Sequence, residues 1–464
     1  MLLHTVPTNK FSDLPLTPAM ISNLDVMGYT AMTPIQAASI PPILDKSDII
    51  AQAKTGSGKT AAFGIGILHQ LNAKHNQVQA LVLCPTRELS EQVAQEMRKL
   101  ARFTTNIKIL TISGGTPIRP QLQSLEHRAH IVVGTPGRIG DHLRRGTLTL
   151  DNLTTLVFDE ADRMLDMGFE NEINEIVSYA PKKRQTLLFS ATFSNAIRTL
   201  STKFQNRAQE ITVESLHSDT VIAQRFFEME WKDKLATTAS ILWTFKPEST
   251  LIFCNTKQQC RDLVDYLSKM KFHCLTINGD LEQKERTEML TLFANRSCSI
   301  LVGTDVAARG LDVKDLSAVI NFDMPFDAEG YVHRIGRTGR AGKEGLAFSL
   351  VTPGEQHRLD DINRYQDTSF RTEDTARLVT HGESMLPPMV TISINGGRKS
   401  KIRPGDILGA LTKEAGIDGK CVGKIDIFEL YSYVAVDRSV ARDVVEKLAQ
   451  IPVKGKRFIA RMHE

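Results

Sequence analysis

Short apolar runs recur along the first part of the chain, and each one ends in a cluster of polar residues. The runs occupy residues 48–53, 80–86, 107–112, 130–136, 155–161 and 185–192. Continuous apolar runs separated by helical patterns are typical of strands in a parallel sheet that helices cover on both faces. Functional groups collect at the carboxyl ends of such strands, so we expect the chemistry of this region in the polar clusters.

The same alternation restarts after the polar stretch "VESLHSDT", which we interpret as a linker. A second set of apolar runs occupies residues 249–256, 273–278, 298–305, 317–323 and 345–351. This set predicts a second parallel sheet of similar size. The expected boundaries are a first α/β domain over residues 1–212, the linker over 213–220 and a second α/β domain over 221–370.

A third region with a different pattern follows a second predicted linker over residues 371–388. Within residues 389–464, here called the tail, strand and helix patterns come in the order β-α-β-β-α-β. That order is typical of a small α+β sandwich of the ferredoxin-like type. The expected fold class is therefore α/β, with two tandem parallel-sheet domains followed by a small α+β domain.

Positive charge concentrates in the tail. Residues 390–464 hold 14 Lys and Arg against 9 Asp and Glu, whereas the remaining residues hold 43 against 44. The stretch "INGGRKSKIRPGD" contributes four of these cations and ends at Asp406, a residue suited to the start of a helix. This excess predicts a polyanionic partner for the tail, and the alternative is a solvated surface without a partner.

The overall composition is that of a soluble globular protein, with 41% hydrophobic and 24% charged residues. No apolar run approaches the roughly 18 residues that a membrane-spanning helix needs, and the N-terminal segment lacks the features of a signal peptide. The six cysteines form no CxxC pair, which disfavours a zinc site and a disulfide framework. Together these features favour a reducing, cytoplasmic location.

The segment "AKTGSGKT" follows the first apolar run and precedes a helical pattern. Glycines let the backbone wrap a phosphate, and successive N–H groups at the helix start supply positive potential. In such a loop the lysine reaches the β- and γ-phosphates and the next hydroxyl binds Mg²⁺, although the first position here is alanine instead of glycine. The candidate phosphate-binding residues are Ala53, Lys54, Thr55, Gly56, Ser57, Gly58, Lys59 and Thr60.

Two further motifs complete a candidate site for nucleotide hydrolysis. "DEAD" offers Asp159 as a metal ligand beside Thr60, and Glu160 as the group that orients or deprotonates an attacking water. In "HRIGRTGR", Arg337 and Arg340 are suited to stabilising charge on a γ-phosphate, which requires the two α/β domains to close over ATP. The alternatives are an acid-rich helix start for the first motif and an ordinary basic turn for the second.

The polar ends of several other runs combine hydroxyls, glycines and arginines. Such groups hold phosphates and sugars without reading sequence. Each cluster alone is typical of a turn or a helix cap, but four of them at strand ends favour a nucleic-acid track. The candidate residues are Pro85, Thr86, Arg87, Gly114, Gly115, Thr135, Pro136, Gly137, Arg138, Gly303 and Thr304.

These motifs, in this order, resemble those of the DEAD-box RNA helicases from Phe11 to about Val351. The resemblance implies two RecA-like domains that close around ATP, Mg²⁺ and single-stranded RNA. The segment "GYTAMTPIQ" is similar to the family's Q motif. By this resemblance Gln36 would read the adenine edge, Phe11 would stack on the base, and Tyr29 belongs to the same pocket. Asp312 would hold the ribose.

The resemblance also assigns residues that couple ATP to RNA. "SAT" is similar to the family's coupling motif, in which Ser190 and Thr192 bond to the DEAD segment. The further residues assigned in this way are Asp162 and His333 for coupling, Gln283, Arg286 and Thr304 for RNA contact, and Arg337 and Arg340 as arginine fingers.

The tail resembles the RRM-like C-terminal domain of the DbpA group of bacterial DEAD-box helicases, both in its opening "SINGGRKSKIRPGDILGAL" and in its element order. This implies recognition of a hairpin of 23S, the large-subunit ribosomal RNA, and a role in ribosome assembly. The expected tail contacts to RNA are Arg398, Lys399, Lys401, Arg403, Tyr431 and Tyr433.

The two tyrosines have a spacing of two along one predicted strand, which suits base stacking in an RRM and equally a half-buried strand face. Two features depart from an ordinary RRM. Glu429 stands where a basic residue is usual, and the first tail strand, "VTISIN", has no aromatic residue.

The leading hypothesis is a monomeric ATP-dependent RNA helicase that remodels 23S ribosomal RNA. Two alternatives stay open on the sequence. One is an ATP-gated clamp that holds RNA without unwinding it, because its motifs would be identical. The other is a general RNA chaperone whose tail is a protein-interaction module.

Overall fold

The computed structural model describes residues 9–53, 56–213, 222–305, 316–339, 344–383 and 386–463. The chain divides into two compact units, Met1–Leu216 and His217–Glu464. The predicted linker over residues 213–220 lies, apart from Val213, outside the described residues. In the described ranges, no helix has the length and apolar character needed to span a membrane.

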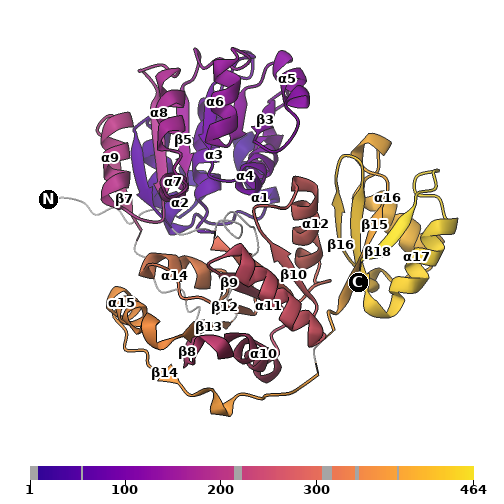
Figure 1. Cartoon of the computed structure of the whole chain (residues 1–464). Coiled ribbons are helices and arrows are strands. Elements are labelled where there is room, and N and C mark those ends of the chain that lie inside the picture. Colours follow the sequence, from indigo (N-terminus) through magenta and orange to yellow (C-terminus); the bar gives the residue numbers. More distant parts are fainter. Residues whose placement is uncertain are drawn as a thin grey trace. The chain divides into compact units, whose positions relative to one another are not determined.

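The first unit is built on a seven-stranded parallel sheet in the order β3-β4-β2-β5-β6-β1-β7 (Figure 1). The strands are β1 (Ile49–Gln52), β2 (Ala80–Leu83), β3 (Ile109–Ile112), β4 (Ile131–Gly134), β5 (Thr155–Asp159), β6 (Gln185–Ser190) and β7 (Gln209–Thr212). Six of them coincide with the six apolar runs. The pattern does not predict the edge strand β7, because only Ile211 of its four residues is buried.

Helices cover both faces of this sheet (Figure 1). They are α1 (Pro18–Val26), α2 (Pro34–Leu44), α3 (Lys59–Gln70), α4 (Arg87–Leu100), α5 (Ile118–Glu126), α6 (Pro136–Arg144), α7 (Ala161–Asp166), α8 (Glu170–Ser178) and α9 (Asn195–Phe204). Alternate strand residues bury on opposite faces: Val157 packs with Phe63 and Met97, whereas Phe158 packs with Leu143 and other apolar residues. Burial on both faces explains why the strands are continuously apolar.

The second unit begins with another seven-stranded parallel sheet, in the order β10-β11-β9-β12-β13-β8-β14. The strands are β8 (Ile222–Glu228), β9 (Thr250–Cys254), β10 (Cys274–Ile277), β11 (Ile300–Thr304), β12 (Ala318–Asn321), β13 (Gly345–Val351) and β14 (Thr372–Glu373). The apolar runs predict five of these strands and miss β8 and β14, which form the edge opposite β10. The helices described here are α10 (Lys234–Phe245), α11 (Lys257–Lys269), α12 (Gln283–Ala294), α14 (Ala328–Ile335) and α15 (Gln356–Gln366).

The tail forms a four-stranded antiparallel sheet in the order β16-β17-β15-β18. Its elements are β15 (Met389–Ile394), α16 (Pro404–Gly409), β16 (Val422–Ile427), β17 (Ser432–Asp437), α17 (Ala441–Gln450) and β18 (Ala460–His463). One face of the sheet packs Ile392 and Val434 against Ile407 of α16 and Val444 of α17. The β-α-β-β-α-β order is confirmed, and with it the expected fold class of two parallel-sheet domains and a small α+β domain.

Candidate nucleotide and RNA sites

The glycine-rich loop is held in place by residues of the predicted Q motif. Thr33 donates from its hydroxyl to the carbonyl oxygen of Ser57 at 2.8 Å, and the Gln36 amide donates to the carbonyl oxygen of Gly58 at 3.2 Å. Gly58 has a φ of +99°, and a Cβ there would overlap the Gln36 amide, so both backbone shape and space favour glycine. α3 starts directly after it, at Lys59.

Gln36 is fully buried, and its amide oxygen also accepts a hydrogen bond from the Thr33 backbone at 2.8 Å. The two residues form a capping box at the start of α2. Gln36 is therefore fixed in register with the phosphate loop, where it would sense the nucleotide; its contact with adenine stays a prediction. Lys54 and Thr55 lie outside the described residues.

Three buried polar atoms at the loop and at the DEAD segment have no hydrogen-bond partner among the described residues: Ser57 Oγ, Lys59 Nζ and Asp159 Oδ1. Burial raises the pKa of Asp159 to about 6, although the Lys59 ammonium acts in the opposite direction. A buried ammonium, hydroxyl and carboxylate left without protein partners fit a phosphate chain with its Mg²⁺. The site therefore has the donor set that nucleotide binding requires.

Glu160 occupies the turn between β5 and α7. Its backbone is left-handed, with φ at +55° and ψ at +54°, and its side chain is buried. Carboxylate oxygen Oε2 lies 2.9 Å from Nη1 of Arg163, which is also buried. Strained backbone in a non-glycine residue often marks a functional position, and here it fixes the direction of the Glu160 carboxylate.

The DEAD segment is tied to the SAT segment. Asp162 accepts a hydrogen bond from the backbone N–H of Ala191 at 2.9 Å. Ser190 Oγ accepts from the backbone N–H of Thr192 at 3.2 Å. The expected pairing of the two segments is thus seen through the Ala191 backbone, and the individual side-chain roles of Ser190 and Thr192 stay predictions.

The candidate RNA residues of the first unit gather at neighbouring strand ends, because β3, β4 and β2 are adjacent in the sheet. The Arg87 guanidinium packs against Gly115, where a Cβ would overlap it. Gly114 donates its N–H to Thr135 Oγ1 at 3.4 Å. Arg138 donates to the Thr116 carbonyl at 3.1 Å from each of two nitrogens.

Thr86 and Thr135 are the N-cap residues of α4 and α6. Pro85, Pro136 and Gly137 lie in the same turns. The three predicted clusters of this unit therefore lie together, with two helix N-termini and arginines of the kind that hold phosphates, and their contact with RNA stays a prediction.

In the second unit, Gln283 and Arg286 lie on the first turns of α12, and Gly303 and Thr304 end β11. Asp312 and Arg340 lie outside the described residues, whereas Arg337 is 5% exposed. His333 lies on α14, where it is partly buried. The roles predicted for these residues stay predictions.

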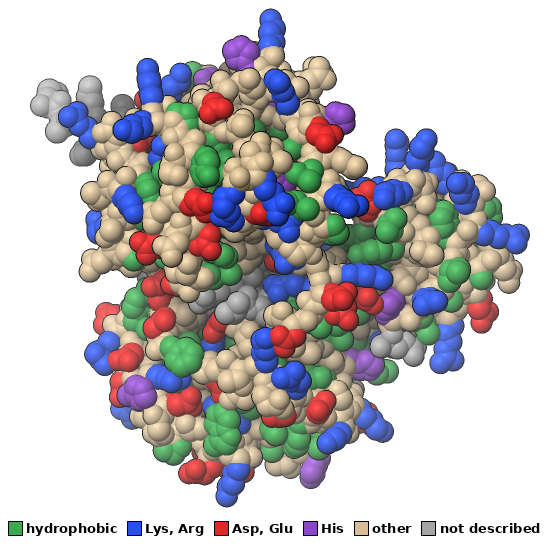
Figure 2. Space-filling view, turned by 45° about the horizontal axis from the view of Figure 1, so that its top comes forward, with side chains coloured by type: hydrophobic (Ala, Val, Ile, Leu, Met, Phe, Trp, Pro, Cys, Tyr) green, Lys and Arg blue, Asp and Glu red, His purple; other side chains and the backbone are tan. Residues whose placement is uncertain are grey.

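The four tail cations Arg398, Lys399, Lys401 and Arg403 are all exposed. Their loop is nonetheless well held: the backbone N–H groups of Arg398 and Lys399 donate to the carbonyls of Phe428 and Glu429 at 2.8 and 2.9 Å. Asp406 accepts from the Arg403 N–H at 2.8 Å at the start of α16, as expected. Among the charged side chains on the visible face of the tail, Lys and Arg predominate over Asp and Glu (Figure 2).

The sheet face that carries Tyr433 packs against α12 within the second unit. Tyr433 is 3% exposed and donates a hydrogen bond to Glu288, which also lies 3.1 Å from Nδ1 of His463. Lys284 lies 6.0 Å from the centre of the Tyr431 ring, which is half-buried. In this arrangement Tyr433 has no face free for a base, in agreement with the alternative of a half-buried strand face.

A second polar contact, which is buried, also fixes the same face. Thr391 is fully buried, and its hydroxyl lies 2.6 Å from Ser297 Oγ and 3.2 Å from the Asn295 amide. Buried polar groups require such partners, so this contact defines the register of the tail on the segment that follows α12.

Comparison with protein families places three models along the chain. A DEAD/DEAH box helicase model matches residues 33–200, a helicase conserved C-terminal domain model matches 233–342, and a DbpA RNA binding domain model matches 391–462. Among curated relatives, the ATP-dependent RNA helicase DbpA of Escherichia coli strain K12 is 48% identical over 441 residues, which is 95% of this chain and 96% of that protein. The chain belongs to the DbpA group of DEAD-box ATP-dependent RNA helicases.

Two further comparisons agree with this membership. The ATP-dependent RNA helicase DbpA of Bacillus subtilis strain 168 is 36% identical over 472 residues, covering 97% of this helicase and 98% of the relative. The solved structure of Saccharomyces cerevisiae Dbp5 bound to RNA and ADP BeF3 covers 79% of this helicase and 96% of that chain, with 30% identity and a TM-score of 0.73. This helicase therefore binds RNA and hydrolyses ATP.

Sequence reasoning missed three residues that organise the sites of this helicase. Arg163 directly follows the DEAD motif, and Arg334 lies inside "HRIGRTGR", so both had a local signal. Ala191 acts through its backbone N–H, for which a side-chain pattern holds no signal. Arg334 is 2% exposed.

Proposed function

We propose that this helicase remodels 23S ribosomal RNA during assembly of the large ribosomal subunit, and that its tail binds a hairpin of that RNA. The proposal is carried by the held loop of four exposed cations in a domain that matches a DbpA RNA binding domain model. Two curated bacterial helicases with the DbpA name are similar over nearly the whole chain, tail included, which supports a shared target.

The candidate RNA site of the core, meaning the two α/β domains, cannot by itself select one RNA over another. Its groups are helix N-termini, glycine N–H groups and the guanidinium groups of Arg87 and Arg138. Such groups hold phosphates and sugars and carry no sequence information. In this proposal the tail therefore selects the RNA, and the core acts on duplexes near the selected hairpin at high effective concentration.

In the ATP site, Lys59 would bind the β- and γ-phosphates, and Thr60 and Asp159 would hold a Mg²⁺ ion. Bound Mg²⁺ would supply electrostatic neutralisation of the phosphate oxygens. Glu160 orients the attacking water and accepts its proton, with its carboxylate direction set by Arg163. Arg337 and Arg340 stabilise charge on the transferred phosphoryl group once the two domains close.

The tail cations bind phosphate oxygens of the hairpin. Because the backbone N–H groups of Arg398 and Lys399 are bonded to the Phe428 and Glu429 carbonyls, this part of the loop loses little conformational entropy when RNA binds. Tyr431 is the one of the two predicted stacking residues that keeps part of its ring accessible. A base contact at Tyr431 and phosphate contacts at the loop would together distinguish a folded hairpin from a random strand.

The test compares ATPase stimulation by a 23S ribosomal RNA fragment with that by unrelated RNA of equal length. We expect the 23S fragment to reach half-maximal stimulation at a concentration at least about tenfold lower, and removal of residues 389–464 to abolish this preference. Because removal of the tail uncovers α12, a full-length variant with Arg398, Lys399, Lys401 and Arg403 replaced by alanine is measured in parallel. A preference that persists in both proteins would refute the targeting role.

Strand separation distinguishes the helicase from an ATP-gated clamp. A short duplex placed beside the tail-binding hairpin is followed by stopped-flow fluorescence during ATP turnover. We expect release of the displaced strand only with ATP and only from the linked duplex. ATP turnover without strand release would favour the clamp.

A further inference from the structure

Helix α4 reaches both candidate sites of the first unit. At its N-terminus, Arg87 packs against Gly115 in the RNA site. Nine residues later, Glu96 accepts a hydrogen bond from the hydroxyl of Tyr29 at 2.7 Å. With a rise of about 1.5 Å per residue, the two positions are roughly 14 Å apart on one helix.

The helix between these positions is a rigid element. Its buried residues Val93, Ala94 and Met97 pack into the core formed with α2, α3 and β1, and each is at most 1% exposed. Close packing of this kind leaves the helix few alternative positions. A displacement of one end of α4 therefore also displaces the other end.

The turn that follows α1 places Tyr29 beside α4. The Tyr29 N–H donates to the Leu24 carbonyl and the Gly28 N–H to the Asp25 carbonyl, both at 3.0 Å, with Gly28 at a φ of +82°. This pattern is a Schellman motif, which reverses the chain after a helix and requires a left-handed residue that glycine adopts most easily. The Phe11 ring contacts Tyr29 edge-on, with centroids 6.0 Å apart.

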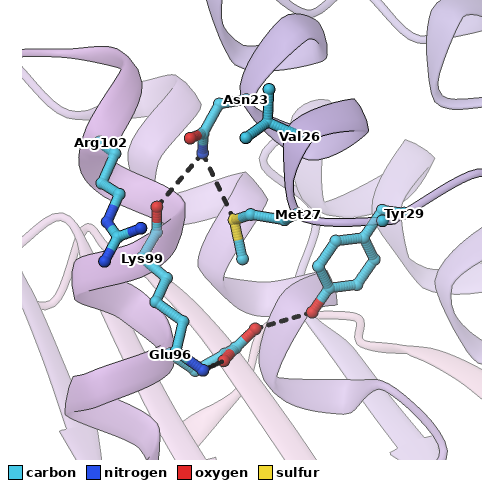
Figure 3. A pocket seen from close by; sticks show the side chains of 8 residues that line it. Asn23, Val26, Met27, Tyr29, Glu96, Lys99 and Arg102 are labelled. Atoms are coloured by element: carbon cyan, nitrogen blue, oxygen red, sulfur yellow. Dashed lines mark hydrogen bonds and ion pairs between the residues drawn. The ribbon is translucent and has the colours of Figure 1, made fainter. Parts of the chain in front are cut away.

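Packing alone leaves the Tyr29 ring room to move. A cavity of about 370 Å³ borders the ring and is lined also by Asn23, Met27, Lys99 and Arg102 (Figure 3). In Figure 3 the Tyr29 hydroxyl points toward the Glu96 carboxylate at the rim of this cavity. The hydrogen bond to Glu96 is therefore the contact that fixes the ring on the side where packing is open.

The Glu96 carboxylate has a second partner besides Tyr29. Its second carboxylate oxygen lies 3.1 Å from the ammonium of Lys99, one turn further along α4. Burial, the hydrogen bond and the Glu96 charge all raise the pKa of Tyr29, so the hydroxyl keeps its proton and donates. The two oxygens of Glu96 thus have distinct partners, one in the nucleotide pocket and one on its own helix.

We propose that Glu96 is a positioning residue that fixes Tyr29 in the nucleotide-base pocket, and that α4 thereby couples RNA contact at Arg87 to ATP binding. The inference rests on the proposed place of Tyr29 in the base pocket. RNA that restrains the N-terminus of α4 stabilises the helix position in which Tyr29 is held, so RNA strengthens ATP binding. By thermodynamic reciprocity, ATP strengthens RNA binding by the same factor.

The test measures KM for ATP, kcat and the dissociation constant of a fluorescent ATP analogue with and without RNA, in the full chain. We expect Glu96→Ala to raise KM for ATP about five- to tenfold, to leave kcat at saturating ATP and RNA within about twofold, and to reduce the RNA-induced gain in nucleotide affinity. Glu96→Gln should recover most of the affinity, because its amide oxygen still accepts from Tyr29.

The matched control is Glu91→Ala on the same helix. Glu91 pairs with Arg98 at 3.3 Å on the exposed side, so its removal changes the charge and a salt bridge without touching Tyr29. Tyr29→Phe, which keeps the ring, should reproduce the effect of Glu96→Ala, and the double variant should be no worse than either single one. If Glu96→Ala behaves like Glu91→Ala in KM and in RNA coupling, the inference is wrong.

Tyr29→Ala separates this inference from the proposed site. A large rise in KM for Tyr29→Ala beside no effect of Glu96→Ala would refute the positioning role alone. An unchanged KM for Tyr29→Ala would remove Tyr29 from the base pocket and overturn both.

Discussion

Arg334 binds Asp305 through two parallel hydrogen bonds, from Nε to Oδ1 at 2.8 Å and from Nη2 to Oδ2 at 2.6 Å. The same guanidinium donates to the Asp323 carbonyl at 2.6 Å and to the side-chain oxygens of Asn321 and Asn255, each at 3.2 Å. One buried side chain thus joins α14 to the carboxyl ends of β9, β11 and β12. It fixes the strand end that carries Thr304 and the helix that leads to Arg337.

Replacing Arg334 by lysine should destabilise the second unit. Lysine keeps the charge but lacks the planar fork, so the partly buried Asp305 carboxylate loses its paired donors and the buried acceptors on Asn321 and Asp323 lose theirs. We expect a loss of about 3 kcal/mol and a lower thermal midpoint, measured by circular dichroism. The control Arg364→Lys changes an exposed pair with Asp361 and should cost less than about 0.5 kcal/mol. Equal shifts in the two variants would contradict this account.

Glu160→Gln should separate ATP binding from hydrolysis. The amide oxygen of glutamine can still accept the Arg163 hydrogen bond, which is 2.9 Å long in the structure, so the local fold is retained. The attacking water loses its base, and single-turnover hydrolysis should slow by about 100-fold or more. Binding of ATP and RNA should be unchanged, and Glu170→Gln, at an exposed acid of α8, should behave as wild type. Near-normal turnover would exclude Glu160 as the base.

Burial of Asp159 makes the nucleotide-free protein sensitive to pH. Its pKa is raised to about 6 in the folded protein, above the value of about 3.9 in an unfolded chain. Between these values the folded state holds a proton that the unfolded state has lost, so this group lowers the free energy of unfolding as pH rises. Above a pH of about 6 the loss is complete.

Thermal midpoints at pH 5 and pH 7.5, in a chelator and without nucleotide, test this dependence. Asp159→Asn should raise the midpoint clearly at pH 7.5 and by a smaller amount at pH 5, because at pH 5 only part of this stability has been lost. Asp151→Asn, at an exposed position, is the control and should change neither value. Parallel pH profiles for wild type and Asp159→Asn would contradict the raised pKa.

Removal of Lys399, Lys401 and Arg403 should weaken RNA binding and flatten its salt dependence. Each lost phosphate contact lowers the slope of log affinity against log salt by about 0.7 for single strands and about 0.9 for a duplex. The matched control replaces the exposed cations Lys413, Lys420 and Arg442, which changes the net charge by the same amount. Affinities are measured by fluorescence anisotropy at several salt concentrations. An unchanged slope for the first variant would mean that these cations do not meet RNA phosphates.

The apolar runs predicted eleven strands of the two large sheets, and the structure has each of them where the pattern placed it. A strand buried on both faces is continuously apolar, so its signal is local. The missed strands β7, β8 and β14 lie at or near one edge of their sheets. There one side lacks a neighbouring strand or a covering helix, and the sequence shows mixed exposure instead of a run.

The motifs likewise predicted a nucleotide site, because a phosphate loop and its carboxylates need particular residues at particular spacings. Contacts that join distant segments had no such signal. The bond from Tyr29 to Glu96 spans 67 residues, and the pairing of Ser297 with Thr391 spans 94. Neither residue type nor spacing indicates these partners.

The sequence alone determined the order of the domains and the family, and it predicted the place of the ATP chemistry, since each depends on local patterns. Only the tertiary structure decided which face of the tail sheet is exposed. It also decided that α4 joins the position of Arg87 to the position of Tyr29. Tyr431 and Tyr433 alternate as a stacking pair would, yet Tyr433 is buried against Glu288. The physical reason is that burial depends on what folds against a residue, and that surface comes from another part of the chain.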